Sequence, residues 1–401
     1  MEGKGAKRGS VQEQSSNKRQ KKNQRNGGGE GSNGKSQGGA VRGYEKLEQT
    51  IKAQLQEYQD TVKDTDERKA KVILYQNKCL RHTATIGAMD IFENLIKVED
   101  IDVNTTNKEG QSPLILASQA GEEEIVNKLL ENPKTNLGVV DVHGYSALLH
   151  CAANNHTEVL KQLLAKSTKE INHKNLVQCS ALVLASNRGH PDIVKELLTH
   201  DKIQVNSEDE SGDSALIHAA EEGHLKVVEM LLAYPDIKVN LRNGNGDVSL
   251  MCASNRGHED IVEKLLKVEG ISVNVKNNDG YTALMCAADK GNNRVMDLLL
   301  AHRDIDVNIV DENGDSALNW AVDKEHKEIV RKIFGHGRVE KNKRNMKTAK
   351  QHLQQGKPNS KEAVFENPLI IAIEDGETEI VKWLLEHNDV NINRCDGFFL
   401  I

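Results

Sequence analysis

Residues 212–240 read GDSALIHAAEEGHLKVVEMLLAYPDIKVN, and this stretch predicts two short helices separated by a glycine. Ser214 stands where a hydroxyl group can accept a hydrogen bond from the first turn of a helix. Gly223 can adopt the left-handed backbone conformation that ends that helix. After it, apolar residues recur at intervals of three and four, as on the buried face of a second helix. These residues are Leu225, Val228, Leu231 and Leu232.

The same pattern recurs every 34 residues on both sides of this stretch. We take Gly212 as the landmark of its unit, and steps of 34 residues reach the landmarks of the other units. Those landmarks are Gly110, Gly144, Gln178, Gly246, Gly280 and Gly314. Four residues after each landmark comes a leucine, and seven residues after it comes a small residue. A period of this length is typical of a solenoid of stacked helical units.

The repeats divide the chain into segments. Eight units are expected over 76–337, and the last is degraded because Ile333 and Phe334 replace its leucine pair. A basic insert is expected at 338–365, followed by another repeat and a partial repeat over 366–401. The partial repeat ends in apolar residues, whereas solenoids normally end in a polar cap. This end favours self-association, docking onto the preceding repeat, or a truncated gene product.

Two further segments precede the repeats. Residues 1–43 hold 11 of the 31 glycines and many lysines, serines and glutamines, a composition typical of disorder. Residues 44–75 predict an amphipathic helix. Capping of the first repeat is favoured over a coiled-coil seam, which needs three or four heptads. The apolar positions of this helix are Leu47, Ile51, Leu55, Tyr58 and Val62.

The repeated unit resembles the ankyrin repeat family over roughly residues 70–401. The resemblance rests on the turn glycine, the Ser/Thr-Ala-Leu that follows it, and the Val-Asn exit of each unit. It implies an all-α fold, a solenoid of antiparallel helix pairs with β-turn loops. A 34-residue period also suits tetratricopeptide repeats, but those lack the turn glycine and the Val-Asn exit.

The composition agrees with slim helices packed in layers. The chain has 401 residues, of which only 3% are aromatic and only six are proline. Its six cysteines form no Cys-x-x-Cys pair, which indicates a reducing compartment. No apolar leader and no run approaching 18 apolar residues occurs. We therefore expect a soluble protein of the cytoplasm, the nucleus or both.

The net charge of −7 conceals a segregation of charge. Residues 1–43 carry +7 and residues 338–365 carry +6, so the remainder carries −20. Within the tail, Lys18, Arg19, Lys21 and Lys22 resemble a nuclear localisation signal, and a solubilising tail is the alternative. The same charges can contact nucleic-acid phosphates nonspecifically, although no aromatic residues interleave for base stacking.

Residues 29–36 match the G-x-x-x-x-G-K-S pattern of a phosphate-binding loop. No apolar strand precedes them, so we predict no nucleotide site there. His190, His224 and His258 lie one unit apart, too far to share a zinc ion, and their expected role is structural. We predict no metal, no cofactor and no catalytic residues. Cys252 and Cys286 also lie one unit apart, so both are expected to be small core residues rather than metal ligands or disulfide partners.

The asparagines that end the exit loops are expected to hydrogen-bond within loops, and the family resemblance implies hydroxylation as an alternative role. They are Asn104, Asn206, Asn240, Asn274 and Asn308.

The resemblance places recognition on the turn tips and the exposed end of each first helix, one, nine and ten residues after the landmark. These positions vary between units while the framework does not. The tyrosines among them are candidate anchors, and the carboxylates favour a partner with a basic segment. The candidate partner-binding residues are Tyr145, Asn187, Arg188, Asp213, Glu221, Glu222, Asp247, Asn255, Arg256, Tyr281, Asp289 and Lys290.

The sequence thus predicts a nonenzymatic scaffold or adaptor that binds a protein partner on the concave turn-and-first-helix face of the solenoid. The alternative is a nuclear regulatory, chromatin-associated or nucleic-acid-associated adaptor that acts through the basic tail.

Overall fold

The computed structural model describes residues 49–50, 53, 57, 65–337 and 378–386. The chain divides into two compact units, Met1–Arg68 and Lys69–Ile401. The basic tail with Lys18, Arg19, Lys21 and Lys22, the phosphate-loop pattern at 29–36 and the basic insert lie outside the described residues. So do most of the predicted capping helix and the apolar end of the chain.

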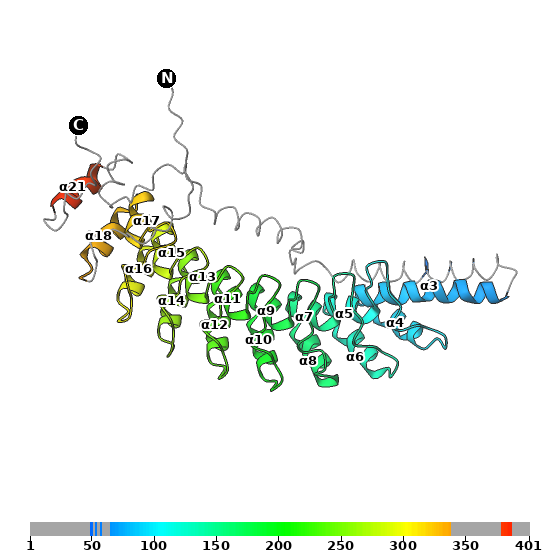
Figure 1. The fold of residues 1–401 in the computed structure, drawn as a ribbon. Coiled ribbons are helices and arrows are strands. Elements are labelled where there is room, and N and C mark those ends of the chain that lie inside the picture. Colours follow the sequence, from blue (N-terminus) through cyan, green and yellow to red (C-terminus); the bar gives the residue numbers. More distant parts are fainter. Residues whose placement is uncertain (1–48, 51–52, 54–56, 58–64, 338–377, 387–401) are drawn as a thin grey trace, which may run out of the picture. The chain divides into compact units, whose positions relative to one another are not determined.

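The described residues form a stack of helix pairs (Figure 1). Each first helix packs against the first helix of the next unit, and each second helix packs against the next second helix. The first helices are α5 (Pro113–Ala120), α7 (Ala147–Asn154), α9 (Ala181–Arg188), α11 (Ala215–Glu222), α13 (Ser249–Arg256), α15 (Ala283–Lys290) and α17 (Ala317–Asp323). The second helices are α6 (Glu123–Glu131), α8 (Thr157–Lys166), α10 (Pro191–Leu198), α12 (Leu225–Leu232), α14 (Glu259–Leu266), α16 (Asn293–Leu300) and α18 (Lys327–Gly335).

A further pair, α3 (Thr65–Ile86) and α4 (Met89–Ile96), precedes α5, and α21 (Thr378–Glu386) is described near the end of the chain. Helix α3 is continuous across the expected boundary between residues 75 and 76. The separate capping helix expected over 44–75 lies mostly outside the described residues, so it stays a prediction. No strand occurs among the described residues, and the turns carry only isolated β-bridges such as Val140 with Ser146. The all-α solenoid predicted from the sequence is therefore confirmed.

Hydroxyl groups begin the first helices, as the sequence predicts. The Ser214 side chain accepts a hydrogen bond from the backbone nitrogen of Ile217 at 3.3 Å. Such a cap contributes about 1 kcal/mol to helix stability. The unit of α13 lacks it, because Val248 occupies the capping position. The equivalent caps in the other units are Ser112, Ser146, Ser180, Thr282 and Ser316.

Gly223 ends α11 with a φ of +83°, in the left-handed conformation. A Cβ at this position would also lie 2.6 Å from a ring carbon of His258 in the next unit. The glycine is thus required twice, by its own backbone and by its neighbour. In the unit of α7 the same position is Asn155, whose φ is 63°. Asparagine tolerates this conformation better than most residues.

The histidines that follow these glycines link consecutive units. Nε2 of His258 bonds to the backbone oxygen of Glu221 at 2.9 Å, and His224 bonds to that of Asn187 at 3.1 Å. His190 does the same with Ala153 at 3.2 Å. Their structural role, predicted from the sequence, is confirmed.

The exit-loop asparagines form a second ladder between units. The Asn206 side chain donates to the carbonyl of Asp236 at 2.8 Å and accepts from the backbone nitrogen of Lys238 at 2.8 Å. Asn104, Asn240 and Asn274 make the same pair of bonds. The expected loop hydrogen bonding is therefore present for these four asparagines, and it engages both ends of each amide.

The core lies between the two layers of helices and consists mainly of leucine, isoleucine, valine and alanine. Cys286 is buried, whereas Cys252 is only partly buried. Burial raises the pKa of both thiols, so neither is a thiolate at neutral pH. Among the described helices, none is both long and apolar enough to cross a membrane.

Candidate partner-binding face

The candidate residues lie on the turns and first helices, but they differ widely in exposure. Exposed members are Arg188, Glu222, Arg256 and Lys290. Partly buried members are Tyr145, Asn187, Glu221, Asp247, Asn255 and Tyr281. Asp213 and Asp289 are only 2% and 7% exposed. The first two groups can offer side-chain atoms to a partner, while the last two aspartates are committed to contacts inside the protein.

The turn before each first helix is held by a side chain that sequence reasoning did not single out. Oδ1 of Asp209 accepts hydrogen bonds from the backbone nitrogens of Ser211 at 2.8 Å and Asp213 at 2.9 Å. Its Oδ2 bonds to Nε2 of His218, on α11, at 2.9 Å. One carboxylate therefore closes the turn and fixes it to the helix. We call this arrangement a turn clamp.

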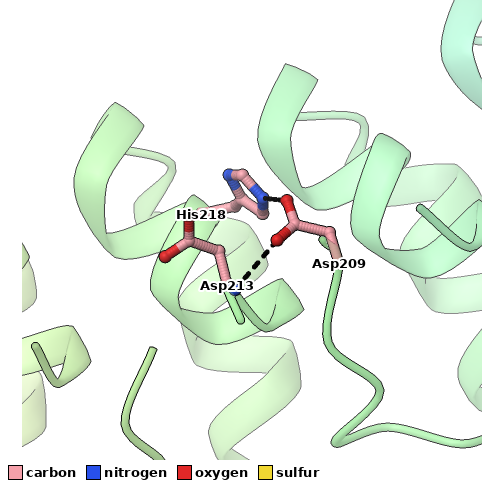
Figure 2. Close-up of side chains that lie close together, drawn as sticks. All are labelled: Asp209, Asp213 and His218. Carbon is pink, nitrogen blue, oxygen red and sulfur yellow. Dashed lines mark hydrogen bonds and ion pairs between the residues drawn. The ribbon is translucent and has the colours of Figure 1, made fainter. Parts of the chain in front are cut away.

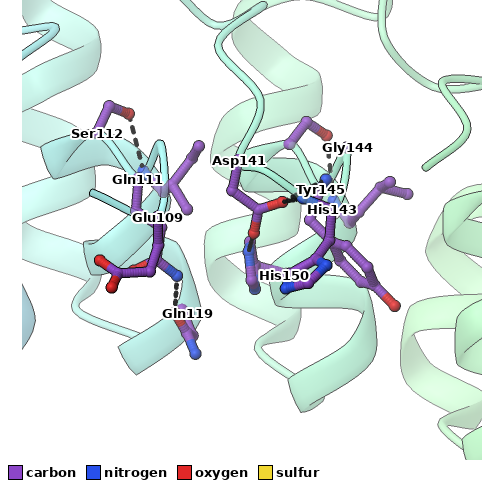
Figure 3. Close-up of polar contacts among 12 residues, drawn as sticks. Glu109, Gln111, Ser112, Gln119, Asp141, His143, Gly144, Tyr145 and His150 are labelled. Atoms are coloured by element: carbon purple, nitrogen blue, oxygen red, sulfur yellow. Dashed lines mark hydrogen bonds and ion pairs between the residues drawn. The ribbon is translucent and has the colours of Figure 1, made fainter. Parts of the chain in front are cut away.

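Two other units have a turn clamp of the same design. Asp141 holds the turn at His143 and Tyr145, and its Oδ2 lies 2.9 Å from Nε2 of His150 (Figure 3). In the unit of α17, Nε1 of Trp320 donates to Oδ2 of Asp311 at 3.1 Å. Each of these aspartates stands three residues before its landmark, and each donor stands six residues after it.

The remaining units place asparagine at the turn position. The amide of Asn243 donates to Oδ1 of Asp213, in the preceding unit, at 2.7 Å. In the same way the amide of Asn277 donates to Oδ1 of Asp247 at 2.8 Å. These bonds join consecutive units, and they explain why Asp213 is buried. Asp213 thus supports the face through Asn243 and contributes charge to it from beneath the surface.

His218 is the centre of a closed polar network (Figure 2). Its Nε2 contacts Asp209, and its Nδ1 lies 2.9 Å from Nδ2 of Asn187 in the preceding unit. Candidate ligand atoms of Asp209, Asp213 and His218 lie within 4.8 Å of one another, a spacing compatible with a cation. However, both ring nitrogens already have protein partners, and Asp213 accepts from Asn243. The arrangement is that of a hydrogen-bond network.

The network carries a strongly negative local field. Burial by itself lowers the pKa of His218, but the hydrogen bond to Asp209 opposes this effect. The charges of Asp213 and Glu221 add to that opposition, so the net result is a raised pKa. Burial by itself raises the pKa of Asp209, but contact with His218 and the backbone hydrogen bonds from Asp213 and Ser211 together lower it.

Glu221 and Glu222 end α11 on the same face. Glu221 is partly buried and forms an ion pair with Arg256 of the next unit, at 2.9 Å. Glu222 is exposed. Their environments differ, so Glu222 is the better candidate for direct contact with a partner, and Glu221 serves both the stack and the local field.

Two aromatic pairs lie in other units of the face. The ring centroids of Tyr145 and His150 are 5.1 Å apart, as are those of Tyr281 and Trp320. Nζ of Lys324 lies 5.5 Å from the centre of the Trp320 ring. Trp320 was not among the predicted site residues, because it stands six residues after its landmark. The donor position of the turn clamp is the signal that would have found it.

Comparison with known proteins agrees with this repeat architecture. A model for three copies of ankyrin repeats matches residues 80–175, 167–243 and 250–345. A single ankyrin repeat matches residues 366–397. No curated protein sequence matches the chain.

Among solved structures, the chain is similar to the ankyrin repeat domain of Bcl-3, described as a unique member of the IkappaB protein family. The two are 27% identical with a TM-score of 0.49, over 55% of this chain and 96% of that one. The family models together cover well over half of the present sequence. This chain belongs to the ankyrin repeat family.

Proposed function

We propose that the protein is a nonenzymatic scaffold that binds a basic segment of a partner protein on its turn-and-first-helix face. Ankyrin repeats generally mediate protein–protein interactions, and the present proposal adds the place and the chemistry. The observation that carries it is the group of carboxylates in one unit: Asp209 and Asp213 lie close to His218, and Glu222 is exposed at the end of α11. Asp209 and Asp213 also oppose the effect of burial on the pKa of His218, and a Lys- or Arg-rich segment would complement their charge.

The face is well suited to binding without large rearrangement. Its turns are clamped by Asp209, its units are joined by Asn243, and Asn187 links His218 to the preceding helix. A partner segment would therefore pay the ordering cost of binding, and the solenoid would contribute a preformed surface. Exposed Glu222 would meet the partner directly, and the buried carboxylates would act through their field.

The test is affinity capture from cell extract, with the bound proteins identified by mass spectrometry. We would compare the natural chain with Glu222→Lys and with the matched control Glu312→Lys, an exposed glutamate on a distant turn. Partners with basic segments should be lost from Glu222→Lys and kept by the control. The proposal would be contradicted if the set of captured proteins is unchanged while the circular dichroism spectra of the variants match that of the natural chain.

A second candidate function is a nuclear or nucleic-acid-associated adaptor. The observation that favours it is the +7 charge of residues 1–43, which includes Lys18, Arg19, Lys21 and Lys22. Binding through this tail would be nonspecific and would weaken steeply with salt, because it releases counterions from the phosphates. A labelled duplex DNA and a labelled single-stranded RNA should bind the full chain at low salt and lose that binding when residues 1–43 are deleted. Equal binding by both chains would exclude this function.

A further inference from the structure

The turns of consecutive units form a continuous row. We define the turn tip as the two residues immediately before each landmark, for example 142–143 and 176–177. The backbone nitrogen of Leu176 donates to the carbonyl of His143 at 3.0 Å, and that of Glu210 donates to the carbonyl of Val177 at 3.0 Å. The same bond recurs from 108–109 to 312–313. Neighbouring tips are therefore held side by side.

Two neighbouring tips are apolar. Val142 is 55% exposed, Leu176 is 70% exposed and Val177 is 45% exposed. Val140 lies in the same turn as Val142 and is 39% exposed. We call these four residues the apolar tips. The remaining tip residues are polar or glycine, and they include His143 beside Val142: Lys108, Glu109, His143, Glu210, Ser211, Gly244, Asn245, Asn278, Asp279, Glu312 and Asn313.

The fold does not explain these apolar residues. The backbone bond between tips needs no particular side chain, since glycine and asparagine make it at the equivalent positions Gly244 and Asn278. Every tip residue is exposed, so apolar side chains there remain in contact with water. Exposed apolar residues gathered on adjacent turns are characteristic of an interaction surface.

The apolar tips border the acidic part of the protein. The next tip along the row begins with Glu210, whose backbone is bonded directly to Val177. Glu210 is exposed, and its unit contains Asp209, Asp213 and Glu222. An anionic lipid surface or a nucleic acid would be repelled by these carboxylates. A protein segment that combines apolar and basic residues matches both parts.

We propose that the apolar tips and Glu210 form one docking site for an extended partner segment. Aliphatic side chains of the segment would cover Val142, Leu176 and Val177, and a lysine or arginine would pair with Glu210. Stacked helices are roughly 10 Å apart, and an extended chain advances about 3.3 Å per residue. The aliphatic and basic residues of the partner are therefore separated by only a few positions. This inference rests on the proposed function and specifies the partner's sequence chemistry.

The experiment is a selection of random peptides displayed on phage against the full-length protein. Enriched peptides should carry two or more aliphatic residues within a few positions of a lysine or arginine. A representative peptide should bind at least tenfold more weakly to the combined variant Val142→Ser, Leu176→Ser, Val177→Ser. Glu210→Lys should weaken it to a similar degree, mainly at low salt. The matched control Asn278→Ser, on a distant tip, should leave its affinity unchanged.

The possible failures are distinguishable. Enriched peptides that are basic without aliphatic residues, and that depend on Glu222 but not on the apolar tips, would overturn the docking site and preserve the proposed function. Peptides insensitive to both sets of substitutions would overturn both. Analytical ultracentrifugation of the natural chain and the serine variant tests whether a second copy of this protein occupies the apolar tips. If the natural chain self-associates and the serine variant does not, the apolar tips are a self-association surface and the inference is wrong.

Discussion

The turn clamps at Asp141–His150 and Asp209–His218 have the same geometry and opposite electrostatics. In each, the histidine Nε2 lies 2.9 Å from the aspartate Oδ2, and the histidine side chain is 12% or 15% exposed. Yet the pKa of His150 is lowered, whereas that of His218 is raised. A hydrogen bond to a carboxylate therefore does not by itself decide the charge of a buried histidine.

The difference comes from the neighbours of each pair. Burial is the largest effect on the pKa of His150 and lowers it. The hydrogen bond and charge of Asp141 oppose burial, while Arg188 and His143 lower the pKa further. Around His218, burial is opposed by Asp209 and also by Asp213, which occupies the position held by Tyr145 in the unit of His150. The two units thus share the hydrogen bond between aspartate and histidine. They differ in the charges around that bond, because the position after the landmark is Tyr145 in one unit and Asp213 in the other.

The largest expected effect is the loss of the clamp itself. Asp209→Leu removes the hydrogen bonds that close the turn and leaves His218 without its carboxylate. We expect the free energy of unfolding to fall by about 3 kcal/mol. Asp141→Leu should cost about 2 kcal/mol, because the lowered pKa of His150 leaves that ring neutral near pH 7, so the bond that is lost is not an ion pair. Urea unfolding followed by circular dichroism measures both. A larger loss for Asp141→Leu would reverse the comparison.

The two histidines should give stability opposite dependences on pH. The folded pKa of His218 lies above its ordinary value of 6.5, so its contribution is fully present below pH 6.5 and is lost as pH rises through the folded pKa. The folded pKa of His150 lies below 6.5, so its contribution is present above pH 6.5 and is lost as pH falls through the folded pKa. NMR titration of the ring protons, assigned with His150→Gln and His218→Gln, would test this. Titration of both rings on the same side of 6.5 would refute it.

The lowered pKa of Asp209 describes the same interaction from the other partner and is not an additional contribution. The stabilisation that ionised Asp209 gives the folded protein is present above pH 3.8 and is lost as pH falls through the folded pKa of Asp209. Together, the two partners define a range of pH in which both are charged and the clamp is strongest. The raised pKa of His218 extends this range upward, whereas the lowered pKa of His150 leaves that ring uncharged from a lower pH.

A smaller effect is expected when a charge near His218 is removed and the turn clamp between Asp209 and His218 is kept. Asp213→Asn preserves the shape of the side chain and an oxygen that can accept from Asn243. It removes one negative charge beside His218, so the pKa of His218 should fall. The matched control is Asp247→Asn. Asp247 accepts the equivalent hydrogen bond one unit away, donated by the amide of Asn277. The NMR titration of His218 should respond to Asp213→Asn much more than to Asp247→Asn, and equal responses would rule out the local field as the cause.

The sequence was sufficient for the framework because each framework residue has one structural task. Ser214 caps a helix, Gly223 ends it, and His224 bonds to the preceding unit, so spacing alone identifies all three. The binding face was harder, because the same residue type performs different tasks. Asp213 and Glu222 both looked like exposed carboxylates, but only Glu222 is exposed.

The information that was missing lies in pairs of positions. Where the turn residue is aspartate, the residue nine positions later is a donor: His150, His218 or Trp320. Where it is asparagine, that later residue is leucine or cysteine. The amides of Asn243 and Asn277 instead donate to a carboxylate in the unit before, whereas the amide of Asn107 donates to Gln111 of its own unit. The asparagines are Asn107, Asn175, Asn243 and Asn277, and the later residues are Leu116, Leu184, Cys252 and Cys286. Hydrophobic periodicity cannot reveal these choices, because they depend on which polar groups meet across two units.

The smallest expected effect concerns Arg188, which lies on the surface. Its guanidinium donates to the backbone carbonyl of Ala153 at 2.9 Å, and its charge lowers the pKa of His150. Arg188→Gln should therefore raise the pKa of His150 slightly, and added salt should produce part of the same rise in the natural chain. Arg256→Gln, the equivalent change two units away, should leave His150 unaffected. If Arg188→Gln does not move the titration of His150 at low salt, Arg188 does not contribute to the lowered pKa of His150, and the difference from His218 rests on the carboxylates around His218.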